Sequence, residues 1–135
     1  MKKVIILIIA LIAVVSTLIW WISPVSFLKS VNAEYISVIN VRDGHTGNSF
    51  EIDNKEDITY IVNNIQEQSF RKDGIFMFRM GTYFTLTFCN ESGGEISRFI
   101  INGDDVIRKD LFFYKTDSDS MKSIIDYLNN LENNL

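Results

Sequence analysis

The sequence predicts an α+β fold, in which an N-terminal transmembrane helix is followed by one small domain. We expect this domain to hold an antiparallel sheet of about five to six strands with two helices on one face. Three observations support this prediction. An uncharged run occupies residues 4–22, strand-like segments of period two fill much of the rest, and two segments have apolar residues at helical spacing. Their order is ββα, then further strands, then α.

Residues 4–22 read VIILIIALIAVVSTLIWWI and carry no charge. A helix rises about 1.5 Å per residue, so a segment of this length crosses the hydrocarbon core of a bilayer. Trp20 and Trp21 stand at its end, where the aromatic residues of membrane helices meet the headgroups, and Pro24 follows as a helix breaker. The lipid bilayer is therefore the first predicted partner, through residues 4–22.

The flanking charges predict how this segment lies in the cell membrane. Lys2 and Lys3 precede it, and basic residues favour the cytoplasmic side. We therefore expect a single-pass protein with a cytoplasmic N-terminus and its domain outside. The predicted divisions are a transmembrane anchor or signal peptide (1–23), a tether (24–33) and an extracytoplasmic α+β domain (34–135).

A cleaved secretory signal is the alternative to an anchor. The apolar region of such a signal normally has about 7–15 residues and is followed by small residues at the cleavage site. Val31, Asn32 and Ala33 offer such a site, although it lies far from the apolar run. The length of the run favours the uncleaved anchor, whereas cleavage near Ala33 would give a secreted protein.

The composition after the apolar run predicts one acidic domain. All ten phenylalanines lie beyond Pro24, so the domain has the side chains for a core of its own. Only Lys2 and Lys3 of the 13 basic residues precede it, which leaves 11 basic against 17 acidic residues and a net charge of −6. This balance excludes electrostatic attraction to nucleic acid. The single cysteine, Cys89, excludes an intramolecular disulfide and indicates a bacterial protein.

The domain is expected to open with a β-hairpin. Residues 34–42 (EYISVINVR) are rich in β-branched side chains and alternate, as in a strand. Residues 43–48 are turn formers, and residues 49–52 return as a short partner strand.

A helix is expected next, capped by Asp53 or Asn54 and running to about Gln68. Its apolar residues follow at i, i+3, i+4 and i+7, which defines one buried stripe. The stripe consists of Ile58, Ile61, Val62 and Ile65. Residues 71–74 are expected to be the connection out of this helix.

The second half predicts an antiparallel meander and a closing helix. The expected strands are 75–80, 82–90, 95–101 and 106–115, the last one interrupted near Lys109. The closing helix has the clearest helical periodicity outside the apolar run. Its stripe comprises Met121, Ile124, Ile125, Leu128, Leu131 and Leu135.

The residues with catalytic chemistry are few. His45, the single histidine, lies in a glycine-flanked turn without a carboxylate or serine partner close in sequence, so we interpret it as a loop residue. Cys89 lies in the middle of a strand, with no helix N-terminus to lower its pKa, and is interpreted as a small structural residue. No catalytic, cofactor or metal site is predicted.

The aromatic residues suggest one candidate interaction face. Tyr83, Thr85 and Thr87 share one side of an expected strand, and Tyr114 lies in another. These four residues could form an exposed strand face that binds a peptide, a glycan or a partner domain. The alternative is that the aromatic residues fill and border the core.

Residues 34–134 resemble the small membrane-anchored extracytoplasmic α+β domains of Gram-positive bacteria. The resemblance lies in the opening hairpin, the acidic start of an Ile-rich helix (NKEDITYIVNNI), the Gly-Gly hairpin (ESGGEISRFII) and the closing amphipathic helix. It implies an envelope location and transfers no functional residue.

The preferred hypothesis is a non-enzymatic, membrane-anchored extracytoplasmic module that binds an envelope protein or a small ligand through the free face of its sheet. A small envelope enzyme is the first alternative, and it requires His45, Cys89 or two carboxylates to converge in a pocket. An immunity or inhibitor protein at the cell surface is the second, and it differs from the preferred hypothesis only in its partner.

Overall fold

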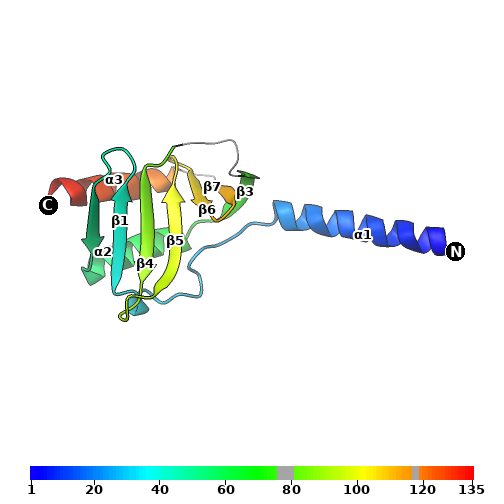
Figure 1. Cartoon of the computed structure of the whole chain (residues 1–135), viewed down its shortest axis with the longest axis horizontal. Coiled ribbons are helices and arrows are strands. Elements are labelled where there is room, and N and C mark those ends of the chain that lie inside the picture. The colour runs from blue at the N-terminus through cyan, green and yellow to red at the C-terminus, as the bar shows by residue number, and fades with distance from the viewer. Residues whose placement is uncertain (76–80, 117–118) are drawn as a thin grey trace.

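The computed structural model describes residues 1–75, 81–116 and 119–135. It is an α+β fold in which an antiparallel sheet is covered by helices on one face (Figure 1). Its helices are α1 (Lys2–Ile22), α2 (Lys55–Gln66) and α3 (Ser120–Asn133), with a short 3-10 helix η1 (Ala33–Tyr35). Its strands are β1 (Val38–Asp43), β2 (Ser49–Ile52), β3 (Phe70–Ile75), β4 (Phe84–Cys89), β5 (Glu95–Ile101), β6 (Val106–Lys109) and β7 (Phe112–Thr116).

Helix α1 projects away from the rest of the chain (Figure 1). It has 21 residues, an 18-residue window with a mean hydropathy of 2.9 and no buried side chain, so it is long and apolar enough to cross a membrane. Such a helix near an N-terminus is also compatible with a signal sequence.

The segment expected to be a tether is packed into the domain. Phe27 and Leu28 belong to the hydrophobic core, with 7% and 8% of their surface exposed. Val25 forms a β-bridge with Phe70 at the outer edge of β3, and Gln66 Nε2 donates to the carbonyl oxygen of Leu28 at 2.7 Å. The prediction of a separate tether over 24–33 is therefore corrected, because these side chains have apolar surface that the core accommodates.

The opening hairpin and the first helix are present, but the first strand begins at Val38 and not at residue 34, because Ala33–Tyr35 form η1, and α2 ends at Gln66. Strands β1 and β2 pair antiparallel, with Ile39 opposite Ile52. Asn54, and not Asp53, caps α2, since its Oδ1 accepts from the backbone N–H groups of Glu56 and Asp57. The predicted α2 stripe is buried against the sheet.

The strand count exceeds the expected five to six. The described residues form a seven-stranded sheet in the order β2-β1-β4-β5-β6-β7-β3. Residues 106–115 form two strands, because Asp110 adopts a positive φ of 55° and turns the chain between β6 and β7. The meander β4-β5-β6-β7 follows chain order as predicted.

Strand β3 lies where a connection was expected. Its residues Arg71 and Lys72 pair with Lys115 and Tyr114 of β7. Phe70 is fully buried at the start of this edge strand, while most of the other β3 side chains are polar, so the alternation that signals a strand is weak. The expected strand 75–80 lies outside the described residues except for Ile75, which ends β3.

Helices α2 and α3 cover the same face of the sheet, as predicted (Figure 1). The buried residues of α3 are Met121, Ile124, Ile125 and Leu128, four members of the predicted stripe. The core lies between these helices and the sheet, and none of the residues that the structure describes forms a helix on the opposite face of the sheet.

Candidate functional site

The face of the sheet opposite the helices carries a groove of about 500 Å³. It crosses four strands, and its polar lining comes from alternate residues that point away from the core. These residues are Asn40 and Arg42 of β1, Ser49 and Glu51 of β2, Thr85 and Thr87 of β4, and Arg98 of β5. We call this surface the open-face groove.

Strand register places the two predicted threonines at the centre of the open-face groove. Thr85 lies directly opposite Arg42 of β1. Thr87 has Asn40 on one side and Arg98 on the other. Each hydroxyl therefore has a longer polar side chain beside it on a neighbouring strand.

The two arginines of the groove differ in their partners. Arg98 donates from Nη2 to Glu95 Oε2 at 2.8 Å, although both side chains are about half exposed. Arg42 is exposed and makes no ion pair with the described part of the chain. The guanidinium of Arg42 therefore presents its donors to solvent beside Thr85.

Tyr83 and Tyr114 occupy different environments. Tyr83 is 37% exposed on the same side of the chain as Thr85 and Thr87, and its ring lies 4.9 Å from that of His45. Tyr114 is 8% exposed, because its position opposite Ile107 turns it toward the core. Burial raises the pKa of the Tyr114 hydroxyl, and the nearby Asp110 carboxylate adds to this effect. Tyr114 is therefore removed from the predicted interaction face.

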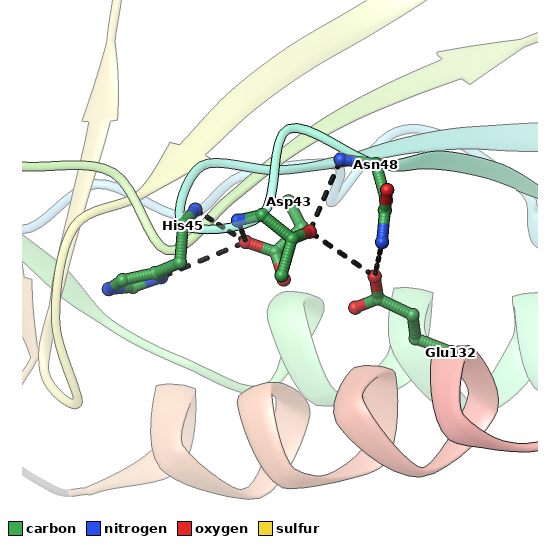
Figure 2. Close-up of polar contacts among 5 residues, drawn as sticks. Asp43, His45, Asn48 and Glu132 are labelled. Atoms are coloured by element: carbon green, nitrogen blue, oxygen red, sulfur yellow. Dashed lines mark hydrogen bonds and ion pairs between the residues drawn. The ribbon is translucent and has the colours of Figure 1, made fainter.

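The turn between β1 and β2 holds a second polar cluster, shown in Figure 2. Asp43 Oδ1 accepts from the backbone N–H groups of His45 at 2.5 Å and Thr46 at 3.1 Å. His45 Nδ1 lies 3.7 Å from the same oxygen. Glu132 of α3 accepts from Asn48 Nδ2 at 3.1 Å, which ties the turn to the last helix.

This cluster supplies the local carboxylate that the sequence interpretation of His45 lacked. Burial alone would raise the pKa of Asp43, but the N–H groups of His45 and Thr46 outweigh it and hold that pKa below its ordinary value of 3.8. The ionised carboxylate is thus engaged by backbone donors. The arrangement stabilises the turn, since the acceptor oxygen near His45 is already hydrogen-bonded.

Of the residues required for the enzyme alternative, carboxylates do share a pocket, since Asp73, Asp105 and Asp119 line one together with Arg71, Lys72 and Lys115. His45 and Cys89 do not converge. Cys89 is buried and pairs with Val38 at the start of β1, whereas His45 follows the end of that strand. Asn40 Nδ2 donates to Cys89 Sγ at 3.6 Å. Among the described residues, no group of three His, Cys, Asp or Glu side chains could hold a metal ion.

No family model, curated protein or solved structure matches this chain. The assignment of the site therefore rests on geometry, and the resemblance to Gram-positive envelope domains stays a prediction. Thr85 and Thr87 were identified from alternation within one strand. Asn40, Arg42 and Arg98 were missed because only the pairing of distant strands brings them beside the threonines, although Asn40 and Arg42 alternate with buried Ile39 and Val41.

Proposed function

We propose that this chain is a non-enzymatic binding module, anchored in the cell membrane by α1 and placed outside the cell, whose ligand binds the open-face groove. The groove itself is the observation that carries the proposal. It lies on the face opposite α2 and α3, over the four strands at the β2 end of the sheet, and is lined by polar side chains from all four.

An uncleaved anchor is supported by the packing of the segment after α1. Cleavage near Ala33 would remove Phe27 and Leu28, which are buried in the core. It would also remove the bridge that Val25 makes to β3. A secreted form would therefore expose apolar surface that the full chain buries.

The chemistry of the groove favours a ligand with carboxylate or phosphate groups. Arg42 supplies guanidinium donors that face solvent, and Thr85 and Thr87 supply hydroxyl groups on the neighbouring strand. Arg98 also lines the groove but is paired with Glu95, and Glu51 adds one carboxylate to the lining. Guanidinium groups bind carboxylate and phosphate through paired hydrogen bonds. Because the domain as a whole is acidic, such a ligand must be held by these local contacts and not by the net charge.

Site-specific photocrosslinking in living cells tests this proposal. A photoreactive residue at Thr87 should give an adduct, whereas the same residue at exposed Thr59 on α2 should not. Arg42→Glu should abolish the Thr87 adduct while leaving the amount of membrane-bound protein unchanged. Equal labelling at both positions, or labelling that survives Arg42→Glu, would contradict binding in the groove.

The chemical identity of the adduct separates the remaining alternatives. A resident envelope component supports the preferred module. An incoming toxin or a hydrolase supports the immunity or inhibitor alternative, which uses the same surface. A covalent adduct formed without irradiation at Cys89 or His45 would instead favour the enzyme.

A further inference from the structure

The end of α1 is packed against one edge of the domain. The ring of Phe112, at the start of β7, lies 5.9 Å from the ring of Trp20 and 6.1 Å from that of Trp21. Lys72 Nζ donates to the carbonyl oxygen of Trp20 at 3.0 Å and lies 4.2 Å from the centre of its ring. The helix and the β3–β7 edge therefore meet through specific side chains.

Two strongly exposed apolar residues lie beside this junction. Leu111, in the turn between β6 and β7, is 65% exposed and directly precedes Phe112. Ile75, at the end of β3, is 52% exposed and lies opposite Phe112 in the strand ladder. The apolar surface of this corner is thus continuous with the tryptophans that end α1.

We propose that this corner of the domain is a second membrane contact, in which Leu111 and Ile75 enter the boundary between headgroups and acyl chains. The inference rests on the proposed membrane anchor. Trp20 and Trp21 occupy the level where aromatic residues meet the headgroups, and Phe112 contacts both rings. Its neighbours Leu111 and Ile75 therefore lie at the same level, where burial of their side chains in lipid is favourable.

The contact is apolar and not electrostatic. Lys72 is engaged by Trp20, and Lys109 Nζ donates to Ser97 Oγ at 2.9 Å. Asp110, which precedes Leu111 in the turn, adds a negative charge that disfavours anionic lipid. Binding therefore requires no anionic headgroup and persists in zwitterionic bilayers.

This contact fixes how the domain stands on the membrane. Strand β3 lies beside α1, and the sheet order places β2 at the opposite end (Figure 1). The sheet consequently stands upright, with β2 farthest from the lipid. The open-face groove, which spans β2, β1, β4 and β5, lies away from the bilayer surface and is open to a partner from the side.

Depth-dependent fluorescence quenching tests the proposal on the full chain in phosphatidylcholine nanodiscs. Cys89→Ser removes the native thiol, and single cysteines at Leu111, Ile75, Leu135 or Ile12 carry an environment-sensitive fluorophore. Leu135 is the matched control, because it is exposed and is the last residue of the chain, whose C-terminal end lies on the side of the domain remote from α1 (Figure 1). Ile12, in the middle of α1, reports on the anchor alone.

The proposal predicts blue-shifted emission at positions 111 and 75, with strong quenching by a spin label near the top of the acyl chain. Position 135 should emit as in water. Quenching at position 12 without quenching at 111 and 75 would overturn the second contact and leave the anchor intact. Loss of quenching at position 12, or failure to enter nanodiscs, would overturn the anchor itself. Quenching at 111 only in nanodiscs containing phosphatidylglycerol would overturn the apolar character of the contact.

Discussion

The ring of Phe27 packs edge-on against the ring of Tyr114, with centroids 4.8 Å apart and planes at 84°. Phe27 comes from the segment that follows α1, and Tyr114 comes from β7 near the end of the sheet. Phe27 also contacts the rings of Phe70 and Phe99. The residues after the apolar helix therefore complete the core, and the fold begins before the expected boundary at residue 34.

Replacing Phe27 tests whether this segment belongs to the fold. Phe27→Ala should lower the free energy of unfolding by about 3–5 kcal/mol, the usual cost of removing a fully packed phenylalanine. The exposed residue Lys29 gives the control, since Lys29→Ala should change the free energy of unfolding by less than about 0.5 kcal/mol. Urea unfolding of the full chain in micelles, followed by circular dichroism, measures both. Equal free energies of unfolding for the two variants would show that residues 24–33 are a tether outside the fold.

Gly44 tests the backbone of the turn that carries His45. A Cβ at this position would lie 2.2 Å from the carbonyl oxygen of Thr82, so the two backbone segments would have to move apart. Gly44→Ala should destabilise the domain by about 1–3 kcal/mol and separate the His45 ring from Tyr83, as NMR chemical shifts of His45 would report. Gly103→Ala is the control, because a Cβ there meets no atom within 4 Å. A stable Gly44→Ala variant with unchanged His45 shifts would contradict this close approach.

Asp43 predicts a pH-dependent contribution to stability. The folded-state pKa of its carboxyl is below the ordinary 3.8, so the stabilisation is present above that value and is lost as pH falls through the folded-state pKa. Asp43→Asn should cost about 1 kcal/mol at neutral pH, the difference between a charge-assisted and a neutral hydrogen bond. The stability gap between the two proteins should close below pH 3.8. A gap that widens in acid would show that Asp43 is not held ionised.

Tyr127 of α3 links that helix to α2, because its hydroxyl donates to Asp57 Oδ1 at 2.5 Å. This hydrogen bond raises the pKa of Tyr127 to about 12, with burial adding to the shift. The resulting stabilisation is complete below pH 10, the ordinary value, and is lost as pH rises toward 12. Tyr127→Phe should cost about 1–2 kcal/mol at neutral pH.

An ultraviolet absorbance titration checks the Tyr127 assignment. Of the five tyrosines, the one removed by Tyr127→Phe should be the one that titrates near 12. Asp57→Asn should lower the pKa of Tyr127 toward its ordinary value of 10. Tyr35→Phe, which changes an exposed ring, should leave the tyrosine that titrates near 12 unchanged. Because burial also raises the pKa of Tyr114, the decisive quantity is the number of tyrosines with a raised pKa. A number that Tyr127→Phe leaves unchanged would contradict the linkage.

Local patterns in the sequence were sufficient for much of the fold. The stripe from Ile58 to Ile65 and the alternation around Phe84 identified α2 and β4, because side-chain periodicity reports which face is buried. Strand β3 was missed because it lies at the sheet edge, where pairing with β7 and not periodicity stabilises it. The packed segment at Phe27 was missed because an isolated pair of apolar residues has no period.

Only part of the candidate site could be predicted from the sequence. Thr85 and Thr87 share a face within one strand, which alternation reveals. Tyr114 also lies in an alternating strand. Which face of that strand meets the core depends on its pairing with β6, where Ile107 lies opposite Tyr114. The flanking residues Arg42 and Arg98 required the strand order β1-β4-β5, a non-local property.

We propose that an uncleaved α1 holds this domain outside the cell. The most direct measurement is the intact mass of the protein recovered from the membrane fraction, combined with protease treatment of intact cells. We expect a membrane-bound chain that retains residues 2–22 and is digested only from outside. A soluble product that begins at Glu34 would contradict it.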